Sequence, residues 1–400
     1  MPPVSRHAVT FVLLSVLIDT IGFGIVLPVL PELIRELRHA GLDDAARWGG
    51  WLAFAYALMQ FFCAPIIGNL SDRFGRRPVL LASLTGFGLD YLVMAFASTF
   101  AWLFVGRLIA GITGAAYSTA NAFIADVTPP ERRAENFGLM GAAFGVGFIL
   151  GPAIGGYLGS FGTRAPFFAA SALALANVLY GFLVLPESLP PDKRRPFSFA
   201  IANPLGSLAM LGRHRGVMTL AAALLLWQLG HQVLPSVWTY YTMLRFNWDP
   251  RIVGLSLAAA GVSMILVQGT LTRFAIPRLG ERRAAAVGLA FGAAGFFVYA
   301  FAPRGWVMFA GLAVFALSGL VYPSINALLS RQAGPDEQGA LQGAVSSLYG
   351  LSEIVGPILM TQVFAAFSSP SAPFLFPGAP FAVAAILTLL AVWLVVTQKP

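Results

Sequence analysis

Four ionisable side chains stand within long apolar segments of this 400-residue sequence: Asp19, Asp90, Arg107 and Glu353. Placing a charged side chain inside a bilayer costs at least ~2.5–3.5 kcal/mol, so each position needs a chemical reason. A carboxyl group in an apolar environment can bind and release a proton near neutral pH. The three acids are therefore candidate proton-coupling groups with Arg107 as their counter-charge. A purely structural ion pair with Arg107 is the alternative for Asp19 and Asp90.

Polar side chains also recur on one face of two other apolar segments. Two such faces could form the wall of a cavity for a small molecule. An internally hydrogen-bonded histidine is the alternative for His231, and packing is the alternative for Trp227 and Trp238. The faces carry Gln228, His231 and Gln232 within residues 215–242, and Ser346, Tyr349 and Glu353 within residues 339–366.

The composition shows which elements must hold these side chains. The hydrophobic share is 58% and the charged share is 10%, against roughly 25% charged residues in soluble domains. Apolar stretches recur along the chain, and each is about 20 residues long, which is the length that a helix needs to span a bilayer. We predict transmembrane helices over residues 8–31, 49–68, 79–97, 100–125, 136–159, 165–185, 215–242, 252–274, 283–301, 305–329, 339–366 and 375–397.

Basic residues are unevenly distributed between the two sides of the predicted membrane. Lys and Arg are concentrated in the N-terminus, the C-terminus and the loops that follow even-numbered helices. Because basic loops remain in the cytoplasm, we expect a multi-pass protein of the cell inner (plasma) membrane with both termini cytoplasmic. This topology explains the formal charge of +8 without a nucleic-acid partner. The single cysteine, Cys63, excludes an internal disulfide.

The chain contains an internal repeat. Shifting the sequence by 205 residues places Gly151-Pro152 on Gly356-Pro357, and a shift of 201 places Gly68 on Gly269. A same-orientation repeat of six helices predicts an all-α membrane protein with two pseudo-symmetric halves and a substrate site between them. We expect halves at residues 1–185 and 215–400, joined by a cytoplasmic linker at 186–214. Chance similarity between two glycine-rich apolar stretches is the alternative.

Three stretches of the first half carry recognisable sequence motifs. Residues 68–78 read GNLSDRFGRRP, and a later predicted helix carries Arg107, Gly111 and Gly114. Together with a glycine-rich stretch in the fifth helix, they resemble the signatures of the major facilitator superfamily. The fifth-helix stretch resembles the signature of its proton-coupled exporters. This exporter motif comprises Gly147, Gly151, Pro152, Gly155 and Gly156.

Longer stretches, including residues 57–61, 71–83 and 137–140, are similar to the tetracycline exporters of that superfamily. The resemblance covers nearly the whole chain and is densest in the first half. It implies a proton-coupled antiporter that exports a drug-like amphipathic small molecule, with tetracycline as a candidate. It also places Asp19 and Asp90 on acidic positions of these exporters. Gln60, within the 57–61 stretch, joins the substrate-binding candidates.

The 68–78 motif gathers charge at one membrane surface. The resemblance implies a latch that joins the two halves on the cytoplasmic side and opens during transport. The alternative is that its arginines only set topology, although the acid and the glycines are not needed for that. The latch candidates are Gly68, Asp72, Arg73, Gly75, Arg76, Arg77 and Asp126.

The exporter motif has a physical consequence of its own. Gly147, Gly151 and Gly155 recur every four residues, so they share one smooth helix face. Pro152 removes one helical hydrogen bond. This pattern predicts close helix packing and permits a bend. A packing role explains the motif as well as a direction-setting hinge does, and only the resemblance favours export.

The second half departs from the tetracycline exporters at ionisable positions. Their proton-coupling aspartate of the ninth helix falls on Gly292 here, and their histidine of the eighth helix falls near Met264. Glu353 and His231 stand where those exporters have uncharged residues. We therefore expect either that proton coupling has moved or that the substrate has changed.

Other functions remain as alternatives. A major facilitator importer or facilitator of a small metabolite would share the fold, but the exporter motif and the aromatic-rich composition disfavour it. A membrane enzyme or receptor is a further alternative, although the sequence has neither a nucleotide-binding loop nor a His-Glu-x-x-His metal motif. We expect a non-enzymatic monomer whose partners are a small-molecule substrate, protons and the lipid bilayer. We expect no cofactor, no metal and no nucleic acid.

Overall fold

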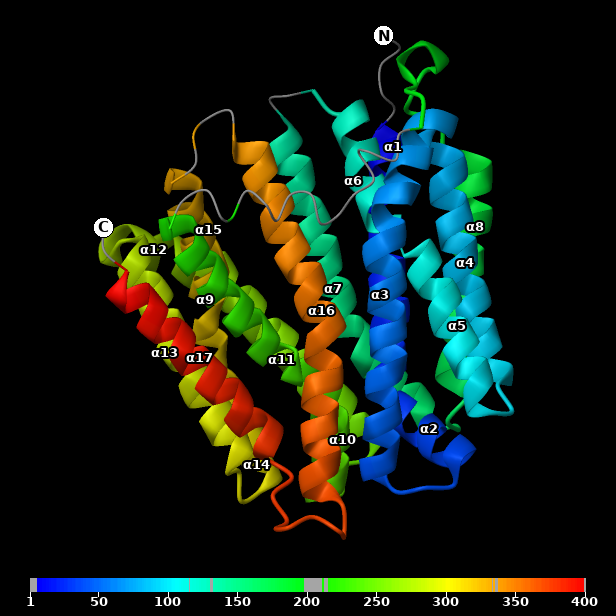
Figure 1. Ribbon diagram of the computed structural model, residues 1–400. Coiled ribbons are helices and arrows are strands. Elements are labelled where there is room, and N and C mark those ends of the chain that lie inside the picture. The colour runs from blue at the N-terminus through cyan, green and yellow to red at the C-terminus, as the bar shows by residue number, and fades with distance from the viewer. Residues whose placement is uncertain are drawn as a thin grey trace. The chain divides into compact units, whose positions relative to one another are not determined.

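A computed structural model describes residues 6–114, 116–129, 132–197, 211, 215–332, 334 and 337–398. The described chain is helical, and Figure 1 shows its helices in order. Among the described residues, 12 helical segments are long and apolar enough to cross a membrane. The predicted all-α architecture with twelve spans is thereby confirmed. The predicted linker at 186–214 lies partly outside the described residues.

Eight helices are described from α1 to α8, and seven of them form the first six spans. The spans are helical because lipid offers no hydrogen-bond partner for a backbone N–H or C=O group. The short α2 lies outside the spans. The helices are α1 (Arg6–Val26), α2 (Leu30–Arg38), α3 (Leu42–Phe74), α4 (Arg76–Phe96), α5 (Phe100–Thr113), α6 (Ala116–Val127), α7 (Arg133–Gly159) and α8 (Ala165–Val184).

The last six spans include two irregular segments. A π-helical stretch, η4 (Val267–Leu271), interrupts the eighth span, and a 3₁₀ stretch, η5 (Leu317–Leu320), interrupts the tenth. These two stretches contact one another. The helices are α9 (Arg215–His231), α10 (Val233–Phe246), α11 (Pro250–Leu266), α12 (Thr272–Leu279), α13 (Glu281–Ala300), α14 (Gly305–Ala316), α15 (Val321–Gln332), α16 (Gln338–Ser368) and α17 (Ala379–Thr397).

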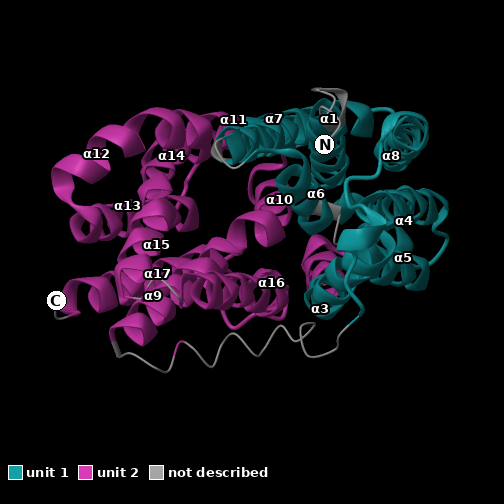
Figure 2. Ribbon diagram, turned by 90° about the horizontal axis from the view of Figure 1, so that it is seen from above, with its two compact units in different colours: residues 1–39, 55–203, 249–258 teal, residues 40–54, 204–248, 259–400 magenta. Residues whose placement is uncertain are grey.

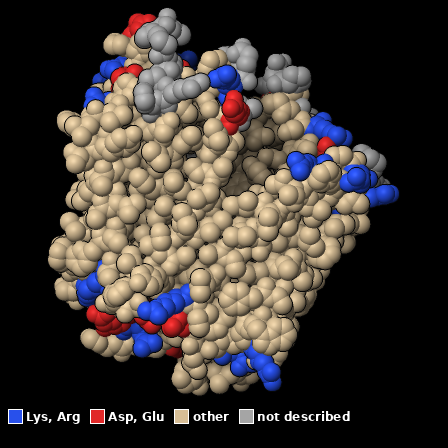
Figure 3. All heavy atoms as spheres, turned by 180° about the vertical axis from the view of Figure 1, so that it is seen from behind, with Lys and Arg blue, Asp and Glu red and all other residues tan. Residues whose placement is uncertain are grey.

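The chain forms two compact units, which Figure 2 colours separately. Unit 1 comprises residues 1–39, 55–203 and 249–258, and unit 2 comprises residues 40–54, 204–248 and 259–400. In unit 1, α1 packs against α7 and α8, and α4 packs against α8 and α5. In unit 2, α13 and α9 both pack against α17. Many large apolar side chains remain exposed, and uncharged residues cover most of the face drawn in Figure 3.

Two close glycine contacts, one in each unit, occupy positions that the sequence shifts relate to each other. In unit 1, a Cβ atom added to Gly156 would lie 3.1 Å from the Cα of Arg251. In unit 2, a Cβ atom added to Gly50 would lie 3.1 Å from the Cβ of Thr361. The 205-residue shift places Gly156 on Thr361, and the 201-residue shift places Gly50 on Arg251. These two contacts are thus related by the shifts that define the predicted repeat.

Candidate functional site

Asp90 and Arg107 form a buried ion pair between α4 and α5. Arg107 also approaches the Sδ atom of Met94 at 2.9 Å, and its guanidinium lies 5.8 Å from the centroid of the Tyr56 ring. A Cβ atom added to Gly106 would lie 2.7 Å from Oδ1 of Asp90. The glycine before Arg107 therefore leaves room for the carboxylate. For Asp90, the geometry is that of the structural ion pair.

Asp19 differs from Asp90 in lacking such a partner. Within the described part of the chain, its side chain forms no ion pair, and its buried Oδ1 atom has no hydrogen-bond partner. Arg107 is engaged with Asp90 instead. The two acids of the first half are thus in different chemical environments, and Asp19 retains acceptor capacity for a proton or a ligand.

Tyr91 is a polar residue of this region that the sequence reasoning missed. Its side chain is buried, and it directly follows Asp90 on α4. The phenol reaches α1, because its Oη atom would lie 3.3 Å from a Cβ atom added to Gly22. Its position directly after an acid in an apolar segment could have identified it from the sequence.

Gln60 has a structural partner. Its Nε2 atom donates a hydrogen bond of 3.3 Å to the carbonyl oxygen of Gly114, at the C-terminal end of α5. A carbonyl at a helix end has no partner within the helix, so a side-chain donor there stabilises the interruption between α5 and α6. Gln60 thus supports the fold in this geometry, and its proposed contact with substrate is untested.

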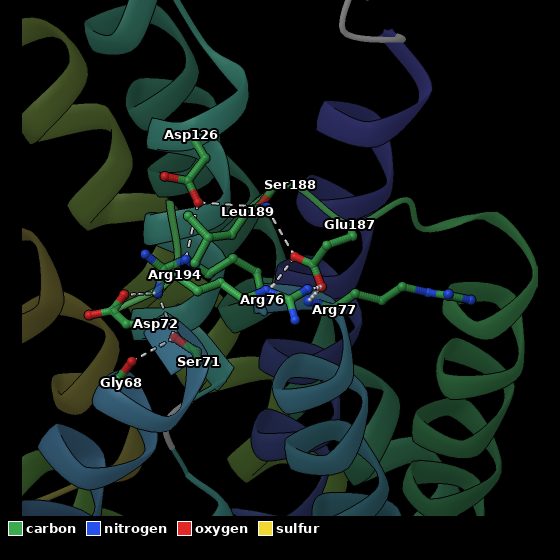
Figure 4. A network of polar contacts seen from close by, with 10 residues as sticks. All are labelled: Gly68, Ser71, Asp72, Arg76, Arg77, Asp126, Glu187, Ser188, Leu189 and Arg194. Atoms are coloured by element: carbon green, nitrogen blue, oxygen red, sulfur yellow. Dashed lines mark hydrogen bonds and ion pairs between the residues drawn. The ribbon is translucent and has the colours of Figure 1, made fainter. Parts of the chain in front are cut away.

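The charge cluster of the 68–78 motif centres on Arg76 (Figure 4). Its guanidinium lies 2.5 Å from Oδ1 of Asp72 and 3.1 Å from Oδ2 of Asp126. It also donates to the Ser71 hydroxyl at 2.6 Å, and that hydroxyl donates to the carbonyl of Gly68 at 2.7 Å. Three of the predicted latch side chains therefore meet within unit 1.

The other two arginines of the motif have different partners. Arg77 donates to the carbonyl of Phe182 at 2.7 Å and lies over its ring. Arg73 lies over the ring of the neighbouring Phe74. Gly75 adopts a φ angle of +107°, which an L-residue with a side chain rarely adopts. The glycine is needed for the turn between α3 and α4.

Glu187, just after α8, is a second residue that the sequence reasoning missed. Its carboxylate accepts hydrogen bonds from the backbone N–H groups of Arg76 at 2.8 Å and Arg77 at 3.3 Å. These are free donors at the start of α4, where negative charge is favourable. Ser188 donates to Asp126 at 3.3 Å, as Figure 4 shows. The first residues after the sixth span thus belong to the same network.

The exporter-motif glycines pack against α1. A Cβ atom added to Gly151 would lie 2.7 Å from the carbonyl oxygen of Ile21 and 2.8 Å from the Cα atom of Gly24. Gly147 faces Thr20 in the same way, and Gly155 faces the backbone of Ile25. Gly156 is turned instead toward the start of α11. The helix continues through Pro152. The predicted close packing of this face is confirmed.

The second-half candidates lie in unit 2. His231 is half-buried, 5.5 Å from the Trp227 ring and 5.9 Å from the Phe315 ring, and no hydrogen bond to it is found in the described residues. Gln232 packs against α16, because a Cβ atom added to Gly356 would lie 2.5 Å from its Cβ atom. Gln228 is half-buried.

The candidates on α16 share a more open face. Glu353 is exposed and Tyr349 is half-buried. The Tyr349 ring packs edge-on against Tyr322, with 5.7 Å between centroids. Among the described residues, no hydrogen bond joins these two to Gln228, His231 or Gln232, and no group of three metal-ligating side chains is found.

Comparisons with known proteins agree with this architecture. The sequence profile of the Major Facilitator Superfamily matches residues 12–357, and an overlapping match covers residues 229–400. The chain belongs to this superfamily. It is 44% identical to the class C tetracycline resistance protein of Escherichia coli over 91% of each chain. It is 41% identical to the class G protein of Vibrio anguillarum over 90% of this chain and 91% of that protein.

Solved structures of the superfamily share the fold. The human organic anion transporter MFSD10 aligns with a TM-score of 0.70 at 27% identity, covering 99% of this chain and 100% of that one. A point mutant of the nucleoside transporter NupG aligns with a TM-score of 0.80 at 14% identity, covering 97% of this chain and 99% of that one, which shows the fold alone. The chain is therefore a multi-pass membrane transporter and not an enzyme.

The structure gives a physical reason for the departure from the tetracycline exporters at Gly292. A Cβ atom added there would lie 2.6 Å from Cζ3 of Trp227 and 3.4 Å from the Cβ atom of Ser318. The indole thus fills the space of a side chain at position 292. Met264 lies beside η5, with its Sδ atom 3.5 Å from a Cβ atom added to Gly319. The space beside Gly292 is thus filled by an aromatic ring.

Proposed function

We propose that this transporter exports a drug-like amphipathic compound in exchange for protons, and that tetracycline is the first compound to test. The observation that carries the proposal is Asp19, a carboxyl group in α1 without an ion pair in the described residues. An antiporter needs such a group, because substrate and proton must compete for linked sites. Arg107, which could have neutralised it, is paired with Asp90.

The resistance proteins named above support the direction of transport. They are similar to this chain over about nine-tenths of its length. The packing of Gly151 and Gly155 on α1 gives the exporter motif a structural counterpart. An importer or facilitator remains the competing function, and nothing in the geometry of unit 1 favours it.

The remaining roles follow from this function. Glu353 is a second proton-coupling candidate, and Asp90 with Arg107 supports Asp19. Gln60, Gln228, His231, Gln232 and Tyr349 are the substrate-binding candidates. The cluster around Arg76 is the cytoplasmic latch. In this proposal the protein is a monomer of the inner membrane, with six-helix halves at 1–185 and 215–400 and both termini in the cytoplasm.

Transport into inside-out membrane vesicles tests the direction and the energy source. With an inward-acidic proton gradient, the vesicles should accumulate radiolabelled tetracycline, and a protonophore should abolish the accumulation. Vesicles containing the Asp19→Asn variant at equal abundance are the matched control. Accumulation that persists without a gradient would contradict antiport, and drug movement only out of these vesicles would favour import. Uptake of other drugs but not tetracycline would narrow the substrate while preserving the exporter assignment.

A further inference from the structure

Two consecutive side chains of α4 reach different neighbouring helices. Asp90 pairs with Arg107 of α5. The Tyr91 ring lies against α1, where its Cε2, Oη and Cζ atoms would be 3.2, 3.3 and 3.5 Å from a Cβ atom added to Gly22. Successive helical residues point about 100° apart, so adjacent positions can face two helices. One turn of α4 therefore connects the Asp90–Arg107 pair with α1.

The position on α1 that Tyr91 reaches is one turn from Asp19. Gly22 follows Asp19 by three residues, and helical residues at that spacing are neighbours on one surface. The Tyr91 side chain is buried at this contact, with 5% of its surface exposed. The Tyr91 phenol thus lies beside α1 one turn from Asp19, and it directly follows the paired Asp90 on α4.

We propose that Tyr91 is a positioning residue for proton exchange at Asp19. Its hydroxyl donates a hydrogen bond to the Asp19 carboxylate when that group has lost its proton, and releases it when the proton returns. The inference rests on the proposed proton antiport. Oδ1 of Asp19 has no hydrogen-bond partner in the described residues, and a phenol O–H is a neutral donor that can supply one.

The other groups around α1 are less suited to this task. From α5, Arg107 is engaged with Asp90, and from α3, Tyr56 lies under the Arg107 guanidinium. From α8, Asn177 contacts α1 at Ser15, whose hydroxyl donates to its Oδ1 at 3.2 Å, and its Nδ2 atom has no partner in the described residues. From α6, which also packs on α1, the buried Thr119 hydroxyl has no partner there either. The close contacts from α7 bring glycines, which have no side-chain donor. Tyr91 differs from these neighbours because its hydroxyl lies beside Gly22, one turn from Asp19, and because it directly follows the paired Asp90.

The Tyr91→Phe variant removes the hydroxyl and keeps the ring that packs on Gly22. Its readout is tetracycline-induced proton release from purified protein in detergent, followed across pH. Losing a donor to the carboxylate favours the protonated form, so the pH midpoint of release should move up by about one unit. Tyr180→Phe is the matched control: this tyrosine of α8 is 38% exposed and contacts the Phe11 ring, and its midpoint should remain that of the wild type.

A second variant tests the same geometry from α1. Gly22→Ala would press a methyl group against the Tyr91 ring and displace its hydroxyl, so its midpoint should move in the same direction as that of Tyr91→Phe. If the wild-type protein releases protons and Tyr91→Phe has the same midpoint, the inference about Tyr91 is wrong while the antiporter assignment stands. If the wild-type protein releases no protons with a compound that the vesicles accumulate, the proposed coupling is wrong and so is the role of Tyr91.

Discussion

The indole of Trp227 occupies the space beside the Cα atom of Gly292, where a Cβ atom would lie 2.6 Å from its Cζ3 atom. Trp227 is buried and packs against Phe296 and Phe315, with 6.1 Å between ring centroids in each case. The absence of a side chain on α13 and the large ring on α9 are thus complementary. A substitution at Gly292 or at Trp227 should therefore disturb the packing of the other residue.

This complementarity predicts non-additive substitutions. Gly292→Asp alone should lower the thermal unfolding midpoint strongly, because the new carboxylate would clash with the indole. Trp227→Ala alone should cost about 3–5 kcal/mol through the cavity that it leaves. The double variant should be more stable than Gly292→Asp alone. The check is a double-mutant cycle of melting midpoints in detergent, and purely additive effects would show that the two positions do not share space.

The two first-half acids should respond differently to neutralisation. Asp19→Asn should abolish drug-induced proton release while leaving the melting midpoint nearly unchanged, because no ion pair is lost within the described residues. Asp90→Asn should lower the melting midpoint, since breaking a buried ion pair costs about 3–5 kcal/mol. Proton release and melting of both purified variants are the measurements. Normal release by Asp19→Asn would exclude it as the coupling group.

Glu353→Gln tests the second coupling candidate. Glu353 is exposed on α16, so its replacement should leave stability unchanged. Proton release should be weaker, or its dependence on pH should change, if the carboxyl group takes part in coupling. Gln342, another exposed position of the same helix, provides the control variant Gln342→Ala. A Glu353→Gln profile identical to that of the wild type would leave Asp19 as the sole coupling candidate.

The charge cluster should matter for transport rather than for insertion. Asp72→Asn removes the acid that lies 2.5 Å from Arg76. Because that acid is 39% exposed, its contribution to stability should be below about 1 kcal/mol. We nevertheless expect the vesicle transport rate to fall several-fold at equal expression. Glu135→Gln, an exposed acid in the first turn of α7, is the matched control. Unchanged transport in Asp72→Asn would mean that the cluster is not a latch and that the motif arginines only set the membrane topology.

The exporter motif permits a comparison within one helix. A Leu side chain at Gly151 would separate α7 from α1, so Gly151→Leu should abolish export from correctly inserted protein. Gly141 lies on the same helix, and a Cβ atom there would meet nothing within 4 Å. Gly141→Leu should therefore retain a larger share of the vesicle uptake. Equal uptake by the two variants would mean that the close contact at Gly151 has no role in transport.

The spans could be predicted from residue order alone, because apolar length is a local pattern of the chain. Apolar length marks a membrane helix wherever the helix ends up. The glycines of the exporter motif could likewise be predicted to pack closely, since their four-residue spacing defines one helix face. The motifs and the acids within spans were equally evident from residue order alone, because charge in an apolar segment stands out.

The tertiary structure decided which of these groups have partners. Arg107 could have neutralised Asp19 or Asp90, and packing of α4 on α5 gives it to Asp90. The Glu187 carboxylate accepts hydrogen bonds from the backbone N–H groups of Arg76 and Arg77, more than 100 positions earlier in the chain. Trp227 fills the space at Gly292 from another helix. Hydropathy and spacing describe one helix at a time, whereas an ion pair, a cap or a filled void depends on a separation of a few ångströms between helices, which only their packing sets.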